Sequence, residues 1–143
     1  MHMMKPIHCL WILAGLSLCT AASAQAADVK LIANTSVSAS KISIDEVKAV
    51  FLVTRTSLGD SQVEPVLGKS GPAHDAFLKE YLGKTDAALT TYYRSLVFTG
   101  KASMPKICDS DAAVVEYIAK TKGAIGYVSA NAATAGTKTI EVK

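Results

Sequence analysis

The chain has 143 residues and a formal net charge of +3, from 15 Lys and Arg against 12 Asp and Glu. The basic residues are scattered along the sequence rather than gathered into a stripe, which argues against nucleic-acid binding. A chain of this length suits one small domain and leaves no room for a second lobe.

The N-terminus has the pattern of a secretory signal peptide. Lys5 precedes an uncharged apolar run over residues 7–19, and small residues ending in Ala-Gln-Ala close the segment. This order predicts that residues 1–26 are removed on export to the periplasm, leaving a single α/β domain over residues 27–143. The apolar run is shorter than the roughly 20 residues of a membrane-spanning helix, so no membrane span is expected in the mature chain. A permanent anchor and lipidation at Cys19 are the alternatives.

Export would leave one cysteine, Cys108, and one histidine, His74. No internal disulfide could form, and this pair makes a poor zinc set, so neither a metal nor a cofactor is predicted. Asp109 and Asp111, which flank a predicted helix start, are interpreted as a cap and a first-turn acid rather than as metal ligands. Cys108 itself is interpreted as a buried or idle thiol, with a reactive thiol as the alternative.

The first predicted element is a strand over residues 29–37, which are apolar and β-branched. Ser43 and Glu46 then form a capping box, the sign of a helix start. The apolar face of this helix is expected to pack on a core, and it is formed by Ile44, Val47 and Phe51.

The middle of the chain predicts a polar loop over 54–62, a strand over 63–67 and two helices. Pro72 suits the first turn of a helix that runs to Leu82. Thr85 caps a longer helix that ends near Phe98. The inward face of this longer helix is predicted to hold Leu89, Tyr93, Leu96 and Val97.

A connector over 101–108 leads to a fourth helix, which begins at Asp109 or Ser110 and buries Val114 and Ile118. Gly123 ends that helix, and two strands over 124–129 and 137–142 close the chain. Because strands and helices interleave, the pattern predicts α/β layering, with a mixed β-sheet flanked by about four helices.

Three segments in fixed order carry a family resemblance: VKAVFLVTRTSLGDSQVEPV at 47–66, AFLKEYLGKTDAALTTYYRSLVFTGK at 76–101 and VVEYIAKTKGAIGYVSA at 114–130. They contain the Gly59-Asp60 turn, the aromatic pair Tyr92-Tyr93, "FTGK" from Phe98, and "GAIGYV" from Gly123. In this order they resemble the phosphate ABC transporter substrate-binding protein family, whose fold is of the periplasmic-binding-protein type. The similarity extends over nearly all of residues 27–143.

The resemblance implies an exported, non-enzymatic solute-binding domain in an ABC-transport context, with inorganic phosphate or a similar oxyanion as its ligand. Family members that carry phosphate have two lobes with the ligand between them, whereas this chain is expected to form one periplasmic-binding-protein-like lobe. An ABC permease or a second copy of the chain is the implied partner. The alternative is a lobe that has lost ligand binding and serves as an envelope interaction domain.

In the family, one lobe supplies an arginine, an aspartate and a Ser-Gly-Thr run at a helix N-terminus. Free N–H groups there attract an oxyanion, while the aspartate accepts a hydrogen bond from a protonated phosphate. Only Ser70-Gly71 matches cleanly here, because Val66 and Gly68 stand in place of the arginine and aspartate, and Pro72 in place of the threonine. Lys69 could supply the charge. The resemblance therefore implies an oxyanion site at Lys69, Ser70 and Gly71, with an ordinary strand-to-helix turn as the alternative.

Two further features have competing interpretations. His74, one turn into the same helix, could add a pH-dependent donor to the anion, although a solvated side chain is the more ordinary interpretation. Tyr92, Tyr93 and Phe98 could form a stacking platform, but their helical spacing favours core packing. Because the chain has no nucleophile elbow, P-loop or zinc-protease motif, enzymatic activity is not predicted.

Overall fold

The computed structural model describes residues 29–143, so the predicted signal peptide lies outside the described residues. Within them, six strands form one mixed sheet in the order β2-β8-β1-β7-β5-β6. These strands are β1 (Val29–Asn34), β2 (Lys41–Ile42), β5 (Glu64–Gly68), β6 (Lys106–Cys108), β7 (Ala124–Ser129) and β8 (Thr137–Val142). A separate hairpin pairs β3 (Ser57–Leu58) with β4 (Ser61–Gln62).

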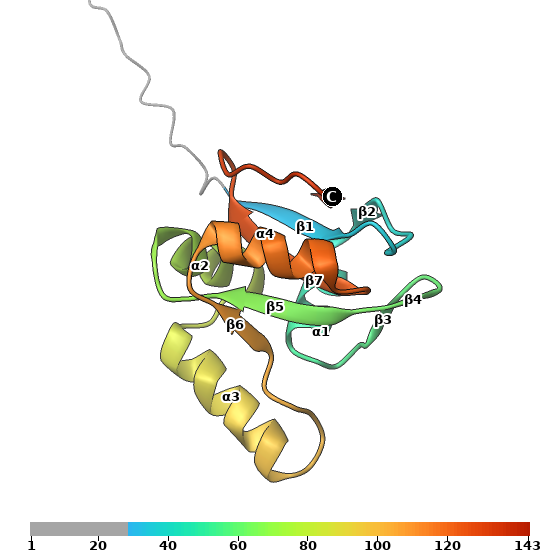
Figure 1. Cartoon of the computed structure of the whole chain (residues 1–143). Helices are drawn as coiled ribbons and strands as arrows, with labels where there is room; N and C mark the ends of the chain where they lie inside the picture. The colour runs from blue at the N-terminus through green and yellow to red at the C-terminus, as the bar shows by residue number, and fades with distance from the viewer. Residues whose placement is uncertain (1–28) are drawn as a thin grey trace, which may run out of the picture.

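Four α-helices accompany the sheet in the described part of the chain (Figure 1). They are α1 (Ile44–Phe51), α2 (Pro72–Phe77), α3 (Asp86–Phe98) and α4 (Asp111–Lys120). A single π-helical turn, η1 (Leu78–Leu82), continues α2. The α/β class, the mixed sheet and the four flanking helices that the sequence predicts are therefore confirmed.

The sheet is assembled around β1. This strand pairs antiparallel with β7 on one side and with β8 on the other, so Leu31 lies between Tyr127 and Ile140. On the far side of β7 the pairing becomes parallel, first with β5 and then with the edge strand β6. The carboxyl ends of β5 and β6 thus lie at the same edge of the sheet, next to the segments that follow them.

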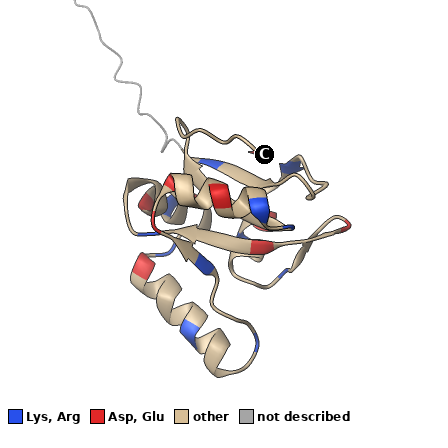
Figure 2. Cartoon of the chain, in the orientation of Figure 1, with Lys and Arg blue, Asp and Glu red and all other residues tan. Residues whose placement is uncertain are grey.

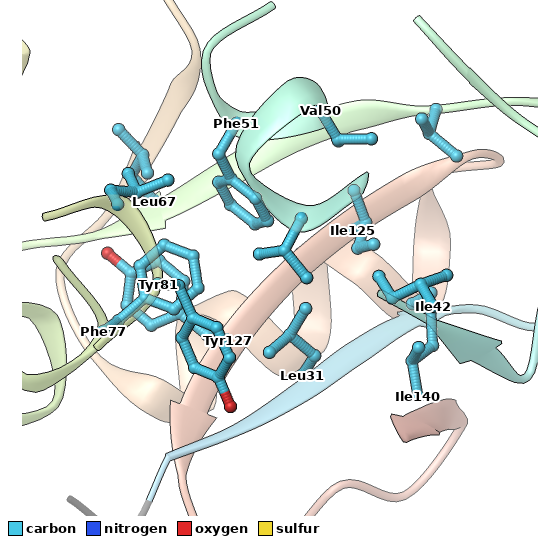
Figure 3. Packing of buried hydrophobic residues seen from close by; sticks show 14 of the residues in the cluster. Leu31, Ile42, Val50, Phe51, Leu67, Phe77, Tyr81, Ile125, Tyr127 and Ile140 are labelled. Atoms are coloured by element: carbon cyan, nitrogen blue, oxygen red, sulfur yellow. The ribbon is translucent and has the colours of Figure 1, made fainter. Parts of the chain in front are cut away.

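One face of the sheet is covered by α1, α2 and η1. Their side chains form the larger core together with inward residues of β1, β5 and β7 (Figure 3). Within it, the Phe77 and Tyr127 rings stack with centroids 3.9 Å apart and planes inclined by 7°. The Phe51 ring meets Phe77 edge-on at 4.7 Å. This aromatic cluster fixes α2 against β7.

The opposite face is covered by α4. Val114 and Ile118, the two residues predicted to be buried, pack against Ile32 and Val66 on the sheet. No helix formed by residues 29–143 has the length and apolarity needed to cross a membrane.

Local predictions were confirmed at several element boundaries. The strands over 124–129 and 137–142 have the predicted bounds. In the capping box, the Glu46 N–H donates to the Ser43 hydroxyl at 3.2 Å, and the Ser43 N–H donates to the Glu46 carboxylate at 2.9 Å. Thr85 caps α3 and Ser110 caps α4.

The helix from Pro72 runs to Leu82 as predicted, although after Phe77 it continues as the wider turn η1 and ends before Gly83, which is in the left-handed conformation. Two predictions of burial were wrong. Ile44 and Val97 were expected to face the core but are 42% and 44% exposed. Ile44 is the first residue of α1, ahead of the part of the helix that contacts the sheet, and Val97 lies in the last turn of α3, beyond the part that packs.

Candidate functional site

The predicted oxyanion residues lie in the turn between β5 and α2. Gly71 is the N-cap of α2 and offers no side-chain cap, while Pro72 occupies the first helical position. The first N–H groups of any α-helix have no acceptor within it. Here the intrahelical pattern begins only when the Asp75 N–H donates to the Gly71 carbonyl at 2.9 Å. The turn therefore presents backbone N–H groups that could donate hydrogen bonds to an oxyanion.

A cavity of about 200 Å³ opens beside this turn. Lys69, Ser70 and His74 line it from the turn and α2, and Asp86 and Thr90 line it from α3. Its remaining walls are apolar or backbone and come from Leu67, Gly68, Leu89, Tyr93, Met104 and Ile107. The structure thus brings three of the four predicted site residues to one cavity. Gly71, the fourth, adjoins them in the chain but does not line the cavity.

His74 is not the solvated side chain that the sequence suggested. It is 4% exposed, because α2 packs onto β7 and turns this side chain inward. Its Nε2 lies 2.7 Å from Oδ1 of Asp86, and its Nδ1 is hydrogen-bonded to the Tyr127 hydroxyl. Both ring nitrogens therefore have partners within the protein, so His74 affects the cavity by positioning the Asp86 carboxylate.

The histidine belongs to a chain of hydrogen bonds that runs from β5 to α3. The Gly68 N–H donates to the Tyr127 hydroxyl at 3.1 Å. Burial raises the pKa of Tyr127 far above its usual value, so the phenol keeps its proton and can donate to Nδ1 of His74. When Nδ1 accepts in this way, Nε2 is the ring nitrogen that can donate to Asp86. This network holds the Asp86 carboxylate at the wall of the cavity.

The charges around the cavity are mixed. The Lys69 ammonium lies 3.9 Å from the Asp109 carboxylate, and both side chains are largely exposed, so the pair is weak and the lysine can turn toward a ligand. Asp86 would repel a fully ionised anion but can accept a hydrogen bond from a protonated one. Hydroxyl donors at Ser70 and Thr90 complete the set. The combination suits a partly protonated oxyanion.

Asp86 and Thr90 were not predicted as site residues. Both lie on α3, and Asp86 has the ordinary position of an acid in a first helical turn. Their approach to the β5–α2 turn depends on how η1 and the Gly83 bend redirect the chain. No local sequence signal could have indicated that Asp86 contacts His74, because twelve residues separate them in the chain.

The other candidate residues have structural roles. Cys108 is buried, as predicted, and burial raises the pKa of its thiol, which disfavours the reactive thiolate. Asp111 lies in the first turn of α4, where its carboxylate accepts the Ser129 N–H at 3.2 Å. Among residues 29–143, no three acidic, His or Cys side chains gather in a way that could hold a metal ion.

The aromatic residues of α3 divide into two groups. Tyr93 is buried and donates its hydroxyl hydrogen to the Phe51 carbonyl, and half-buried Tyr92 donates to the Leu52 carbonyl at 2.6 Å. Core packing is therefore confirmed for Tyr93. It was wrong for Phe98, which is 92% exposed because the last turn of α3 extends past the sheet.

No family model matches the chain, and no curated protein matches it either. Several solved structures do match the chain. The chain is 18% identical to a protein from Clostridium perfringens described as a phosphate ABC transporter substrate-binding protein with bound phosphate, with a TM-score of 0.62. It is 13% identical to PstS from Borrelia burgdorferi, with a TM-score of 0.61, and 11% identical to an ABC-type phosphate transport receptor from Vibrio cholerae, with a TM-score of 0.54.

These likenesses establish the fold. They cover 80%, 81% and 80% of this chain but only 44%, 47% and 46% of those three chains, in the same order. The chain therefore spans less than half the length of the structures that it resembles. Over that part it has their α/β fold, as the sequence resemblance implied.

Proposed function

We propose that this protein is an exported, non-enzymatic binding protein for inorganic phosphate or a similar oxyanion, held in the cavity between the β5–α2 turn and α3. The observation that carries the proposal is the convergence of Lys69, Ser70 and Asp86 on one cavity at the start of α2. The fold shared with phosphate transport receptors supports it. In this proposal residues 1–26 are removed on export, the working protein is periplasmic, and its partner is an ABC permease or a second copy of the chain.

Each polar group of the cavity has a distinct task in this proposal. The open N–H groups of α2 and the Ser70 hydroxyl donate to the oxyanion, and Lys69 supplies the balancing charge. Asp86, positioned by His74, accepts from the proton that phosphate keeps near neutral pH. Sulfate carries no such proton, so the carboxylate would disfavour it. Because the site is open to water, affinity is expected to be modest.

Thermal unfolding of the purified protein with phosphate, sulfate or chloride at matched ionic strength tests the proposal. Ligand at a hundred times its dissociation constant stabilises a protein by about 2.7 kcal/mol. For a domain of this size, that corresponds to an increase in melting temperature of roughly ten degrees. We expect the increase with phosphate only. If no anion raises the melting temperature selectively, the lobe has lost ligand binding and the interaction-domain alternative replaces this proposal.

Variants locate the site. Lys69→Ala and Ser70→Ala should each weaken phosphate binding by about fivefold or more, the effect of one exposed charge-assisted contact. Asp86→Asn should reduce the preference for phosphate over sulfate. The matched control is Lys41→Ala, which removes another exposed lysine from an ion pair, at 3.1 Å from Glu141, on the opposite edge of the sheet. Equal phosphate affinity in the Lys69, Ser70 and Lys41 variants would remove this cavity from consideration.

A further inference from the structure

A buried histidine and a half-exposed carboxylate form a pair at the wall of the cavity. The His74 side chain is 4% exposed, whereas the Asp86 side chain, 2.7 Å away, is 51% exposed. Asp86 is the first residue of α3, and the start of that helix is coloured as acidic in Figure 2. Both residues line the cavity of about 200 Å³. A proton taken up anywhere in this pair therefore removes one negative charge from the cavity wall.

The hydrogen bonds of Tyr127 determine where the pair holds its first proton. Within residues 29–143 the Tyr127 hydroxyl has two partners, the Gly68 N–H at 3.1 Å and Nδ1 of His74. A backbone N–H can only donate, so the phenol hydrogen is left for Nδ1 and the ring hydrogen lies on Nε2, facing Asp86. In this arrangement the pair of His74 and Asp86 carries one negative charge.

A second proton, taken up from solvent, has two positions open to it. On Nδ1 of His74, it would point at the Tyr127 oxygen and displace the phenol hydrogen from its acceptor. On Asp86, it would leave the bond between Tyr127 and His74 intact. Two titratable groups in direct contact take up protons as a unit, so the distinction does not alter the result. In either position, the pair becomes neutral.

Few other titratable or charged groups face this pair. Those that line the same cavity or bond to His74 are Tyr127 on β7, Tyr93 on α3 and Lys69 in the turn after β5. Burial raises the pKa of both tyrosines far above its usual value, so they keep their protons. The charged residues of the other neighbouring elements lie elsewhere: Asp75, Lys79 and Lys84 line a second cavity, which includes Asp86 but not His74, while Lys30 on β1 and Glu64 on β5 bond to Ala132 and Tyr117.

We infer that His74 and Asp86 take up one proton as a unit when the pH falls below neutral, and that this proton opens the site to fully ionised oxyanions such as sulfate. Histidine titrates near neutral pH. Above that range, the negative pair repels an anion that brings no proton of its own. Below it, the neutral pair no longer opposes the attraction of Lys69. His74 is thus a positioning residue that sets specificity through Asp86, and this role rests on the proposed function because it concerns the anion in the same cavity.

Isothermal titration calorimetry of the purified protein with sulfate, at about pH 8 and about pH 5.5, tests this role across the range in which histidine titrates. Sulfate itself does not titrate there. We expect sulfate to bind roughly tenfold more tightly at the lower pH, the effect of removing one like charge from a half-exposed site. Near neutral pH, sulfate binding should take up protons, which is measured as a dependence of the heat on the ionisation heat of the buffer.

Three variants separate the contributions. His74→Gln keeps a donor for Asp86 but does not titrate, so the change in sulfate affinity with pH should shrink to about twofold or less. Asp86→Asn removes the charge at every pH, so it should bind sulfate at both pH values as tightly as the wild type does at the lower one. The matched control is Asp75→Asn, which removes the exposed acid next to His74 and should keep the full pH dependence.

Each outcome decides the matter. Sulfate affinity that rises at low pH in the wild type and in Asp75→Asn, but not in His74→Gln, supports the inference, provided that circular dichroism shows the variants folded. If His74→Gln does not fold, Asp86→Asn carries the same comparison, because its site is half-exposed. A protein that binds phosphate but whose sulfate affinity is independent of pH overturns this inference alone. Binding of neither anion at either pH overturns the proposed function and this inference with it.

Discussion

Gly126 sets how closely β7 approaches α4. A Cβ atom at this position would lie 2.9 Å from Cδ1 of Ile118, 3.0 Å from the Val66 carbonyl oxygen and 3.4 Å from Cγ1 of Val114. The carbonyl cannot retreat without disturbing the sheet. We therefore expect Gly126→Ala to lower the free energy of unfolding by about 1–3 kcal/mol, the usual effect of overpacking. Urea denaturation monitored by circular dichroism measures it.

Gly68→Ala is the control for that substitution. Gly68 is the last residue of β5, the strand next to β7. A Cβ added there would come no closer than 3.7 Å to the Tyr127 ring, which is an ordinary contact. Its effect on the urea midpoint should be clearly smaller. Equal losses in the two variants would contradict the close approach at Gly126.

The surroundings of single residues also explain which site residues could be predicted from the sequence. Lys69 and Ser70 were proposed because the adjacent Ser70-Gly71 pair, just before a helix, matches part of the family's anion-binding run. His74 was misassigned because its environment depends on Tyr127, 53 residues later, and on Asp86. Packing requires the first glycine of the "GAIGYV" run. Gly123 adopts a φ of +77°, and a Cβ there would lie 2.4 Å from the Gln62 carbonyl oxygen.

At the scale of elements, α1 is the helix whose start the sequence defines best. Ser43→Ala removes the hydroxyl that accepts the Glu46 N–H, so we expect a loss of about 1 kcal/mol in the free energy of unfolding. Chemical denaturation measures the loss. The control is Ser95→Ala in the exposed part of α3, where alanine is the better helix former and no loss is expected. A Ser43→Ala protein as stable as wild type would show that the cap contributes nothing.

Elements were predictable where the local signal was long. The strands over 124–129 and 137–142 are apolar or alternating over six residues, and their bounds were correct. β2, β3 and β4 have two residues each and β6 has three, too few for any periodicity, so they were missed. The end of α3 at Phe98 was predicted correctly, but the burial of its last residues was not: the apolar period continues through Val97 and Phe98, beyond the part of the helix that packs on the core.

At the scale of the whole molecule, two buried phenols limit stability in alkali. Burial is the largest cause that raises the pKa of both Tyr93 and Tyr127 far above the usual value of 10.0. The folded protein therefore holds these protons more tightly than the unfolded chain. Their stabilising contribution is complete below the unfolded pKa, near 10, and is lost as pH rises beyond it.

Urea midpoints measured from neutral to strongly alkaline pH should accordingly be constant at first and then fall above about pH 10. Tyr127→Phe should flatten that fall, while lowering stability at neutral pH by about 1–3 kcal/mol, because Gly68 and His74 lose a hydrogen-bond partner. The control is Tyr117→Phe, because Tyr117 is only half-buried and its hydroxyl donates to Glu64 at 2.9 Å. A fall that is equally steep in the Tyr127 and Tyr117 variants would contradict the role of burial.

The position of β1 also governs when the molecule can fold. This strand is synthesised first, yet it lies in the middle of the sheet and both its neighbours come last, with Leu31 opposite Tyr127 and Ile140. The nascent chain cannot close its sheet until nearly all of it has been made, and pairing between such distant segments is slow. The middle of the sheet therefore stays open until the last strands have been made, which is the condition that the proposed export of an unfolded chain would require.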